Sequence, residues 1–304
     1  MDKLSNRTIK ITIQKLNKNG KVEDEKIFNN INAKFAFTKY IGASLYGIGS
    51  VSICGLERNT LDKLISFASA DKVLEERKII KVEAGYEGTK QALIIDGSVM
   101  SAIPTAPPDI WLKCEIVNGY ELQDKYITLS IAKGLTLQEY VEFIAKEIGV
   151  DLLVRIQNKN YLSKKMSGGS FAGNQNQLVA TISEEFGVVK EDDKDKCGKI
   201  IAYVDNGTLI VDYYDLDKRD ERLNDPILIS KDTGMVGLPE MSLAGHFANI
   251  TTILKPDVYV GDVIQLKSEQ LKSANGLYFV QGITYTGEFR GTSWYSTFSC
   301  WRID

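Results

Sequence analysis

The sequence predicts a mainly β protein of the α+β class, with a β-domain at each end of the chain and an inserted α/β region between them. Three observations support this prediction. Apolar residues at every second position, the pattern of half-buried strands, recur through the first and last thirds of the chain. Two helical patterns with clear end signals lie in the middle third. An apolar strand ending in glycine, followed by a strand with a cysteine, occurs once in each outer third.

Composition is that of an ordinary folded protein. With 304 residues, 43% hydrophobic and 25% charged, the chain can bury a substantial core, and its length allows about two domains. Its 37 basic and 40 acidic residues give a net charge of -3, which does not favour a nucleic acid held through its phosphates. Neither an apolar signal segment nor an apolar run of the roughly 18 residues of a membrane helix is present, so we expect synthesis in the cytoplasm and no membrane span.

The first third predicts a small β-domain, residues 1–118, with a single helix. Asn19-Gly20 is a hairpin signal between the first two strands, and Asn59 is expected to cap a helix that runs to Ala68. Prolines mark the link before the last strand, because proline cannot donate to a sheet ladder. Strands are expected over residues 9–13, 31–40, 50–56, 78–86, 90–103 and 109–120.

The middle region, residues 119–225, predicts two helices with short strands around them. Residues 136–149 carry one apolar stripe, with a capping box formed by Thr136 and Glu139 and a stop at Gly149. The second helix is expected over 175–186, where apolar residues recur every fourth position and Gly187 follows. Further strands are expected at 151–157 and 199–215, the latter turning at Asn206-Gly207.

The last third, residues 226–304, predicts a second β-domain. Strands are expected over residues 226–230, 249–254, 262–268, 276–288 and 294–303. The stretch KDTGMVGLPE at its start suits a joint between the inserted region and this domain: Gly234 and Gly237 permit unusual backbone angles, and Pro239 fixes the exit. No helix with a lysine follows it, so it lacks the physical basis of a phosphate cradle.

The pattern that occurs in both outer thirds is an internal echo: Gly97 and Cys114 in the first third correspond to Gly282 and Cys300 in the last. A glycine inside a strand often marks a bulge or a bend where a sheet curls into a barrel. The echo therefore suggests two related β-barrel domains, with Gly97 and Gly282 as their bends and both cysteines facing inward.

Motifs for catalysis, metals and cofactors are missing, so we expect none of the three. The four cysteines form no close pairs for zinc, and the single histidine, His246, stands without a nucleophile elbow or a second ligand at helical spacing. GIGSVS (47–52) and SGGSFAG (167–173) lack the residues that complete a nucleotide-binding loop; we expect a β-turn and a flexible loop. KEDDKDK (190–196) is expected to be a solvated loop, with a cation site as the alternative. Paired carboxylates within 212–221 leave a glycosidase open.

The motifs in chain order resemble baseplate hub proteins of phages and contractile tails, the group that includes tail protein D of the late-control type and the N-terminal part of type VI spike proteins. The resemblance spans nearly the whole chain, through VEAGYEG, LIIDGSV, LKCEIVNGY, TLQEYVEFIAKEIGV, FAGNQNQLVATISEEFGV, GTLIVDYYD, TGMVGLPE, ILKPDVYVGDVIQL, GLYFVQGITYTGE and WYSTFSC.

This resemblance implies a structural role without enzymatic activity. Each chain is expected to carry two tube-like β-barrel domains, so that a homotrimer presents a pseudo-sixfold ring to the tail tube and holds the central spike on its other face. The implied partners are the spike, the tail tube or tube-initiator protein and other baseplate proteins, in the tail baseplate of a virion or injection particle. A tail tube or tube-initiator protein is the alternative, and a peptidoglycan-degrading tail enzyme is a further one.

Overall fold

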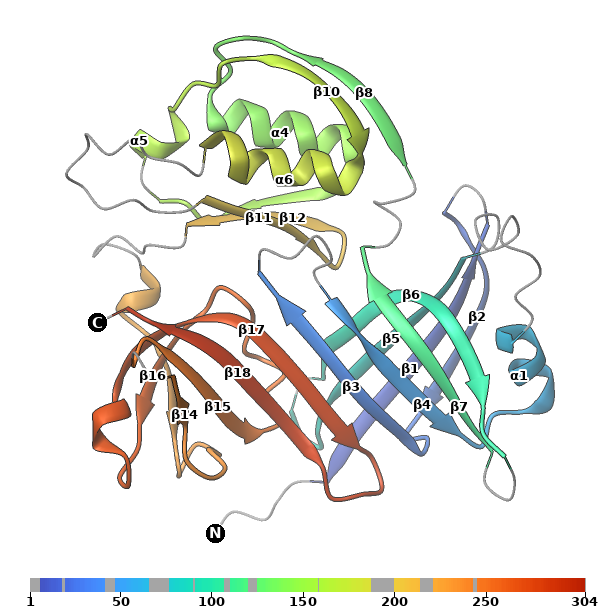
Figure 1. The fold of residues 1–304 in the computed structure, drawn as a ribbon. Coiled ribbons are helices and arrows are strands. Elements are labelled where there is room, and N and C mark those ends of the chain that lie inside the picture. The colour runs from blue at the N-terminus through green and yellow to red at the C-terminus, as the bar shows by residue number, and fades with distance from the viewer. Residues whose placement is uncertain are drawn as a thin grey trace.

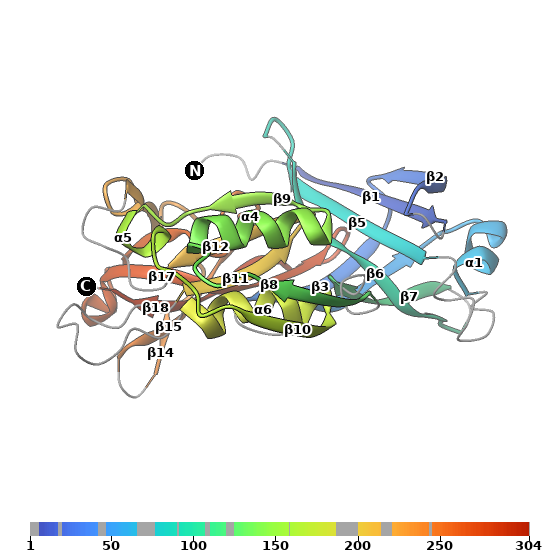
Figure 2. The same cartoon turned by 90° about the horizontal axis from the view of Figure 1, so that it is seen from above.

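The computed structural model describes residues 6–17, 20–41, 47–65, 77–89, 91–106, 110–119, 125–157, 159–186, 200–213, 221–242 and 245–303. Two parts are seen in Figure 1. A large β-sheet forms the lower part, and an α/β unit from the middle of the chain lies above one rim of it, as the view from above also shows (Figure 2).

The first third of the chain forms seven antiparallel strands in the order β3-β4-β7-β6-β5-β1-β2. Alternate side chains of these strands are buried, as the period of two predicted, and pack into the core. The elements are β1 Arg7–Leu16, β2 Val22–Asn29, β3 Ala33–Tyr40, β4 Gly47–Cys54, α1 Arg58–Ile65, β5 Arg77–Tyr86, β6 Ala92–Pro104 and β7 Trp111–Asn118.

The last third forms the other half of the sheet, in the order β14-β15-β18-β17, with β16 on β17 and the parallel strand β13 on β16. All five strands expected here are present, and β14 is an additional short one. The elements are η1 Glu221–Leu223, β13 Ile227–Ser230, β14 Glu240–Met241, β15 Phe247–Ile253, β16 Val263–Lys267, η2 Lys272–Ala274, β17 Gly276–Glu288 and β18 Trp294–Arg302.

Strands β3 and β17 pair and merge the two halves into one 13-stranded sheet. Their ladder runs from Gly282 opposite Tyr40 to Glu288 opposite Lys34, and a single cluster of buried apolar side chains extends through both halves. The mainly β fold class is confirmed. Among the described strands the path of pairing begins at β14 and ends at β2 without closing into a barrel. The domain boundaries at residues 118 and 225 stay a prediction.

The inserted unit has its own apolar core. Helices α4 and α6 lie between a two-stranded ribbon, β8 with β10, and a three-stranded sheet of β9, β11 and β12 (Figure 1). The elements are β8 Tyr126–Ile131, α4 Leu137–Ile148, β9 Asp151–Val154, α5 Lys159–Leu162, β10 Gly169–Asn174, α6 Gln175–Phe186, β11 Ile200–Asp205 and β12 Thr208–Tyr213.

Local signals predicted this unit's helix ends and its hairpin. The Thr136 hydroxyl accepts from the Glu139 N–H, the Glu139 carboxylate accepts from the Thr136 N–H, and Gly149 ends α4 in the left-handed region, so the capping box is confirmed. Helix α6 spans the predicted residues. Asn206 and Gly207 turn the β11–β12 hairpin with φ of 50° and 76°.

Three predictions of local structure were wrong. Residues 31–40 do not pair with 9–13: β1 pairs with β2, which lies in the charged stretch between the two expected strands, and the apolar strand β3 pairs with β17. GIGSVS is part of β4, and residues 169–173 of SGGSFAG belong to β10, which pairs with β8, because cross-strand pairing overrides the turn preference of glycine.

The cap of the first helix is also corrected. Helix α1 begins at Arg58, and the N–H groups of Thr60 and Leu61 both donate to the carbonyl of Glu57, so Asn59 lies inside the first turn. Several predicted features lie outside the described residues: Asn19, Ala68, Gly187, the loop at 190–196 and Cys197.

Candidate functional site

Charged side chains gather where the inserted unit meets the large sheet, and Asp212 at the end of β12 lies at their centre. The Asp212 side chain has no exposed surface, although it is ionisable. The guanidinium of Arg222, in η1, donates two hydrogen bonds to the Asp212 carboxylate: Nη1 to Oδ2 at 2.9 Å and Nη2 to Oδ1 at 3.0 Å. The same Nη1 donates to the carbonyl of Gly261 at 2.6 Å. Such forked pairs fix orientation as well as adding energy.

The loop before β16 completes this cluster from the side of the sheet. Arg155, just after β9, donates from Nη1 to the carbonyl of Val260 at 3.1 Å, and this nitrogen lies 3.7 Å from Asp212 and 4.0 Å from Asp262. Gly261 has a φ of 90°, and a Cβ atom there would lie 2.5 Å from the Arg155 nitrogen. A side chain at this position would strain the backbone and would displace the Arg155 and Asp212 side chains from their present contacts.

A second buried pair lies at the end of β3. Lys39 Nζ is 3.0 and 3.2 Å from the two carboxylate oxygens of Asp205, and the two side chains are 5% and 10% exposed. Lys39 belongs to the large sheet and Asp205 to the tip of the β11–β12 hairpin. Removing one partner of such a pair leaves a buried charge, which costs about 3–5 kcal/mol.

We call these six residues the seam: Lys39, Arg155, Asp205, Asp212, Arg222 and Asp262. They join four separate stretches of chain and hold the inserted unit in one orientation on the sheet. Burial raises the pKa of Asp262, and it also raises the pKa of Tyr203, whose hydroxyl donates to the Val260 carbonyl at 3.3 Å. The charged groups of the seam pair with one another, so the seam fixes the position of the inserted unit on the sheet.

On the outward side of the large sheet, two neighbouring rows of residues are poor in charge, although Lys34 and Glu288 form an ion pair beyond them. Thr251, Thr297, Thr284 and Thr38 lie side by side on four neighbouring strands. Their hydroxyls pair with each other, Thr251 with Thr297 at 3.0 Å and Thr38 with Thr284 at 2.9 Å. These contacts place uncharged hydroxyl groups side by side across the four strands.

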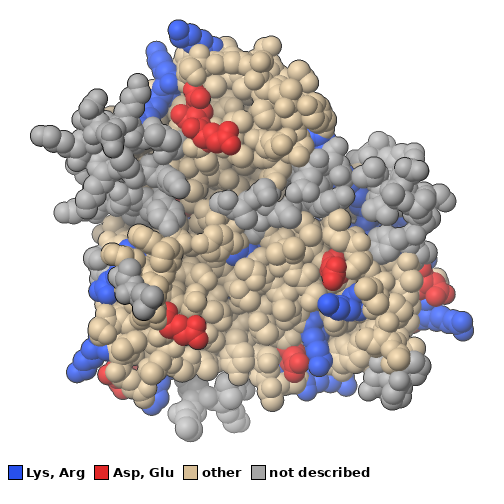
Figure 3. All heavy atoms as spheres, viewed as in Figure 1, with Lys and Arg blue, Asp and Glu red and all other residues tan. Residues whose placement is uncertain are grey.

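The next row of this face, two residues along each strand, is similar. It holds Ile253, Tyr295, Thr286, Ala36, Ser50 and Glu115, of which Glu115 alone is charged. We call the two rows the hydroxyl face. Figure 3 views the sheet from this side, and the centre of the face carries few charged side chains. A stretch of sheet surface with a single charged residue indicates a surface that functions within an assembly.

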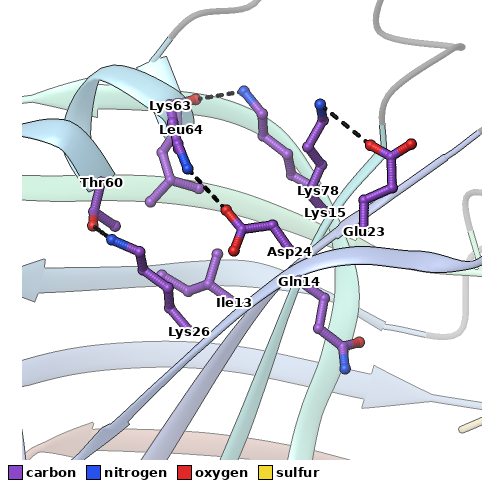
Figure 4. A pocket seen from close by; sticks show the side chains of 10 residues that line it. All are labelled: Ile13, Gln14, Lys15, Glu23, Asp24, Lys26, Thr60, Lys63, Leu64 and Lys78. Atoms are coloured by element: carbon purple, nitrogen blue, oxygen red, sulfur yellow. Dashed lines mark hydrogen bonds and ion pairs between the residues drawn. The ribbon is translucent and has the colours of Figure 1, made fainter.

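A pocket of about 390 Å³ lies at the opposite end of the sheet, between α1 and strands β1, β2 and β5 (Figure 4). Its charges are largely paired: Lys63 with Asp24 at 2.9 Å and Lys15 with Glu23 at 3.4 Å. The first pair ties α1 to β2, and the second lies within the β1–β2 hairpin. The lining residues are Ile13, Gln14, Lys15, Glu23, Asp24, Lys26, Thr60, Lys63, Leu64 and Lys78.

The stretch 231–240 lies along the edge of the large sheet, beside β15. The Ile253 N–H donates to the Gly234 carbonyl at 2.9 Å, and β14 resumes the pairing at Glu240. Gly234 and Gly237 have φ of 100° and 71°, and Pro239 follows immediately before β14. The role of Gly234, Gly237 and Pro239 as an interdomain joint stays a prediction.

Gly97 lies in β6 and Gly282 in β17, each within a strand. Gly282 follows an irregularity in the pairing of β17 with β18, and in β6 a similar irregularity comes between Val99 and Ser101. Cys114 and Cys300 are both buried, as predicted, and burial raises the pKa of the Cys114 thiol to about 12. Cys114 pairs with a residue after Gly97 and Cys300 with one before Gly282, so the two glycines are not equivalent positions. Their role as barrel bends stays a prediction.

The residues considered for chemistry do not converge. His246 is exposed and its ring stacks on Trp301, with centroids 5.6 Å apart. Within the described part of the chain, no group of three or more His, Cys, Asp or Glu side chains could hold a metal ion. The helices of that part include none long and apolar enough to cross a membrane.

Sequence reasoning missed the seam. Asp212 and Arg222 lie at the two ends of a charged stretch in which the sequence distinguishes no residue, and Arg155, just after β9, and Asp205, at the end of β11, belong to no motif. Contacts with distant segments bury these residues, and the neighbouring sequence does not reveal those contacts. A usable signal was present at Asp212, a single acid at the end of an otherwise apolar strand.

A family comparison matches nearly the whole chain. The sequence pattern of the family described as Baseplate hub gp41 matches residues 8–300. The search of curated proteins found no match.

Solved structures share the fold at low sequence identity. The tail protein from Neisseria meningitidis MC58 has 11% identity and a TM-score of 0.53, over 96% of each chain. The E. coli c3393 protein, a type VI secretion component with structural similarity to the T4 bacteriophage tail proteins gp27 and gp5, has 10% identity and a TM-score of 0.57, over 90% of this chain and 74% of that chain.

A longer protein also shares the fold. The half-lidded Francisella PdpA-VgrG complex has 9% identity and a TM-score of 0.59, over 98% of this chain and 58% of that chain. For the lidless PdpA-VgrG complex the latter share is 65%, so this chain spans less than two thirds of those chains.

Replacing Asp262 with Asn should stabilise the protein at pH 7. A carboxyl whose folded pKa is raised contributes its full stability below the unfolded pKa of about 3.9 and loses it as pH rises through the folded value. The gain in free energy of unfolding, measured with urea, should therefore shrink between pH 7 and pH 4. Asp257→Asn, at an exposed carboxyl of the same loop, is the control. A gain that is constant with pH would contradict the burial of a charged Asp262.

The two glycines of the 231–240 stretch should differ in their tolerance of alanine. Gly237→Ala should lower the free energy of unfolding by about 1–2 kcal/mol, because an L-residue is disfavoured in the left-handed backbone region. No further cost is expected, since no atom lies within 4 Å of the added Cβ. Gly234→Ala should cost more, since its Cβ would lie 2.6 Å from Cγ1 of Ile253. Urea unfolding of both variants measures the difference, and equal costs would show that the contact with Ile253 relaxes freely.

Proposed function

Since this chain belongs to the Baseplate hub gp41 family, as its ordered motifs predicted, we propose that three copies form a ring joining the tail tube to the central spike. Family membership makes the protein a structural component of a tail or injection-system baseplate. The proposal goes further than family membership in three respects: the ring, its three copies, and its contacts with the tail tube and the spike. They are supported by the fold and by the seam.

The observation that carries the proposal is the junction of the two β halves. Strands β3 and β17 pair over seven residues, and one apolar core runs through both halves, so each chain supplies two curved pieces of sheet in a fixed relation. Three chains would supply six such pieces. A ring of this kind has threefold symmetry and presents a nearly sixfold surface to a hexameric tube.

The hydroxyl face suits the inner wall of this ring. A wall has to let a long molecule pass without holding it, and the face has internally paired hydroxyls, with Glu115 as its one charge. A lysine-rich wall would retain a polyanion by neutralising its phosphates. The inserted unit, held rigidly by the seam, would then stand at one rim of the ring and face a neighbouring ring or the spike.

The spike as a partner is supported by fold similarity. The Francisella complex contains VgrG, and the E. coli protein is described as similar to the tail proteins gp27 and gp5. A tube subunit is the second candidate; it is less favoured because a hexameric tube needs a single β-domain from each chain, whereas this chain brings two into one sheet. The family is structural, so we propose no enzymatic role.

Copy number in assembled tails tests the proposal. Native mass measurement of detergent-released baseplates, together with electron microscopy of whole tails, should find three copies at the junction of tube and spike. Six copies, or a regular repeat of the protein along the shaft, would identify a tube subunit and contradict the hub ring. A monomer in assembled tails would contradict both.

A further inference from the structure

We propose that β8 is a docking strand: its open edge takes an extended segment from another protein of the assembly, which adds to the β8–β10 ribbon as a third strand. The ribbon covers the helices of the inserted unit on the side away from the large sheet (Figure 1). Its strands pair from Asn174 opposite Tyr126 to Gly169 opposite Ile131. Among the described strands, β8 pairs with β10 alone.

Some exposed sheet edges of this protein are protected against pairing with another strand, and others are not. The large sheet ends at β2, which carries four successive charged residues from Glu23 to Lys26, and at the short strands β14 and β13, which have two and four residues and each follow a proline. Charges, prolines and very short strands are the usual protection of an edge against unwanted pairing. Neither β8 nor β10 contains a charge or a proline. Among the edge strands described, the six-residue strands β8 and β10 therefore lack this protection, whereas β13 (ILIS) is also uncharged but has only four residues and follows Pro226.

Of the two ribbon strands, β8 is the better template. Its sequence YITLSI is rich in β-branched and aromatic residues, which favour strands, whereas β10 contains two glycines. Strand β10 also leads directly into α6, where the side chain of Gln177 accepts the Asn174 N–H at 2.9 Å. In an antiparallel pair, alternate N–H and C=O groups of each strand point away from the partner. On β8 these groups form a row that another strand complements.

The chemistry of the flanks indicates what kind of segment docks. Lys125 and Lys133, both exposed, lie just beyond the two ends of β8. They favour a segment with an uncharged centre and acidic residues at its ends. Pairing of β8 with β8 of a second copy is disfavoured, because an antiparallel arrangement would place the lysines of one copy beside those of the other.

Hydrogen exchange tests this inference. Backbone amides of residues 126–131 are compared between the purified full-length protein and the same protein in isolated tail particles. The outward amides should exchange at least about tenfold more slowly in the particles. Equal rates would overturn the proposal. Slowing in the purified protein that grows with its concentration would indicate self-pairing and would also overturn it.

A matched pair of variants separates the edge of β8 from the outer face of the ribbon. Thr128 and Ala172 lie opposite each other on that face, one on each strand. Thr128→Asp should abolish the protection in particles, whereas Ala172→Asp should leave it; retained protection in Thr128→Asp would count against docking at β8. The copy number of the ring does not enter this test, so a failed trimer measurement would leave it interpretable.

Discussion

The pairing of β3 with β17 is the contact on which the rest of the structure depends. These strands come from opposite ends of the chain, and each buries alternate side chains in the same core: Phe35 and Phe37 from β3, Ile283 and Tyr285 from β17. Without this ladder each half would expose a long edge and half of a shared apolar surface. Backbone pairing and burial thus act together to turn two small sheets into one wall.

The position of the inserted unit follows from the same contact. Lys39 ends β3 and holds Asp205, while the loop that precedes β16 and β17 supplies the Val260 and Gly261 carbonyls to Arg155 and Arg222. Both buried charge clusters of the seam are therefore anchored next to the joined strands. A change in the register of β3 on β17 would move both anchors, so the orientation of the inserted unit reports on the integrity of the sheet.

The sequence predicted what local interactions determine. The ends of α4 are set by Thr136, Glu139 and Gly149, which act within one turn, and the β11–β12 turn is set by its own two residues. Strand pairing was predicted poorly, because residues 31–40 gave no sign that their partner lies some 240 positions away. Strand β2 was missed because an edge strand has little need of apolar residues. Of the candidate site, the glycine joint was noticed from its composition, but the seam was not, since burial by distant segments decides whether a charged residue is solvated or paired.

The central claim is that the two β halves are one cooperative unit. Hydrogen exchange of the purified protein in increasing urea measures it most directly, through the free energy of opening at buried strands of each half, β5 in the first and β18 in the second. The joined sheet predicts that both sets of amides exchange through one unfolding event, with the same free energy and the same dependence on urea. Two distinct free energies, with β5 opening while β18 stays protected or the reverse, would show that the halves are separate domains and contradict this account.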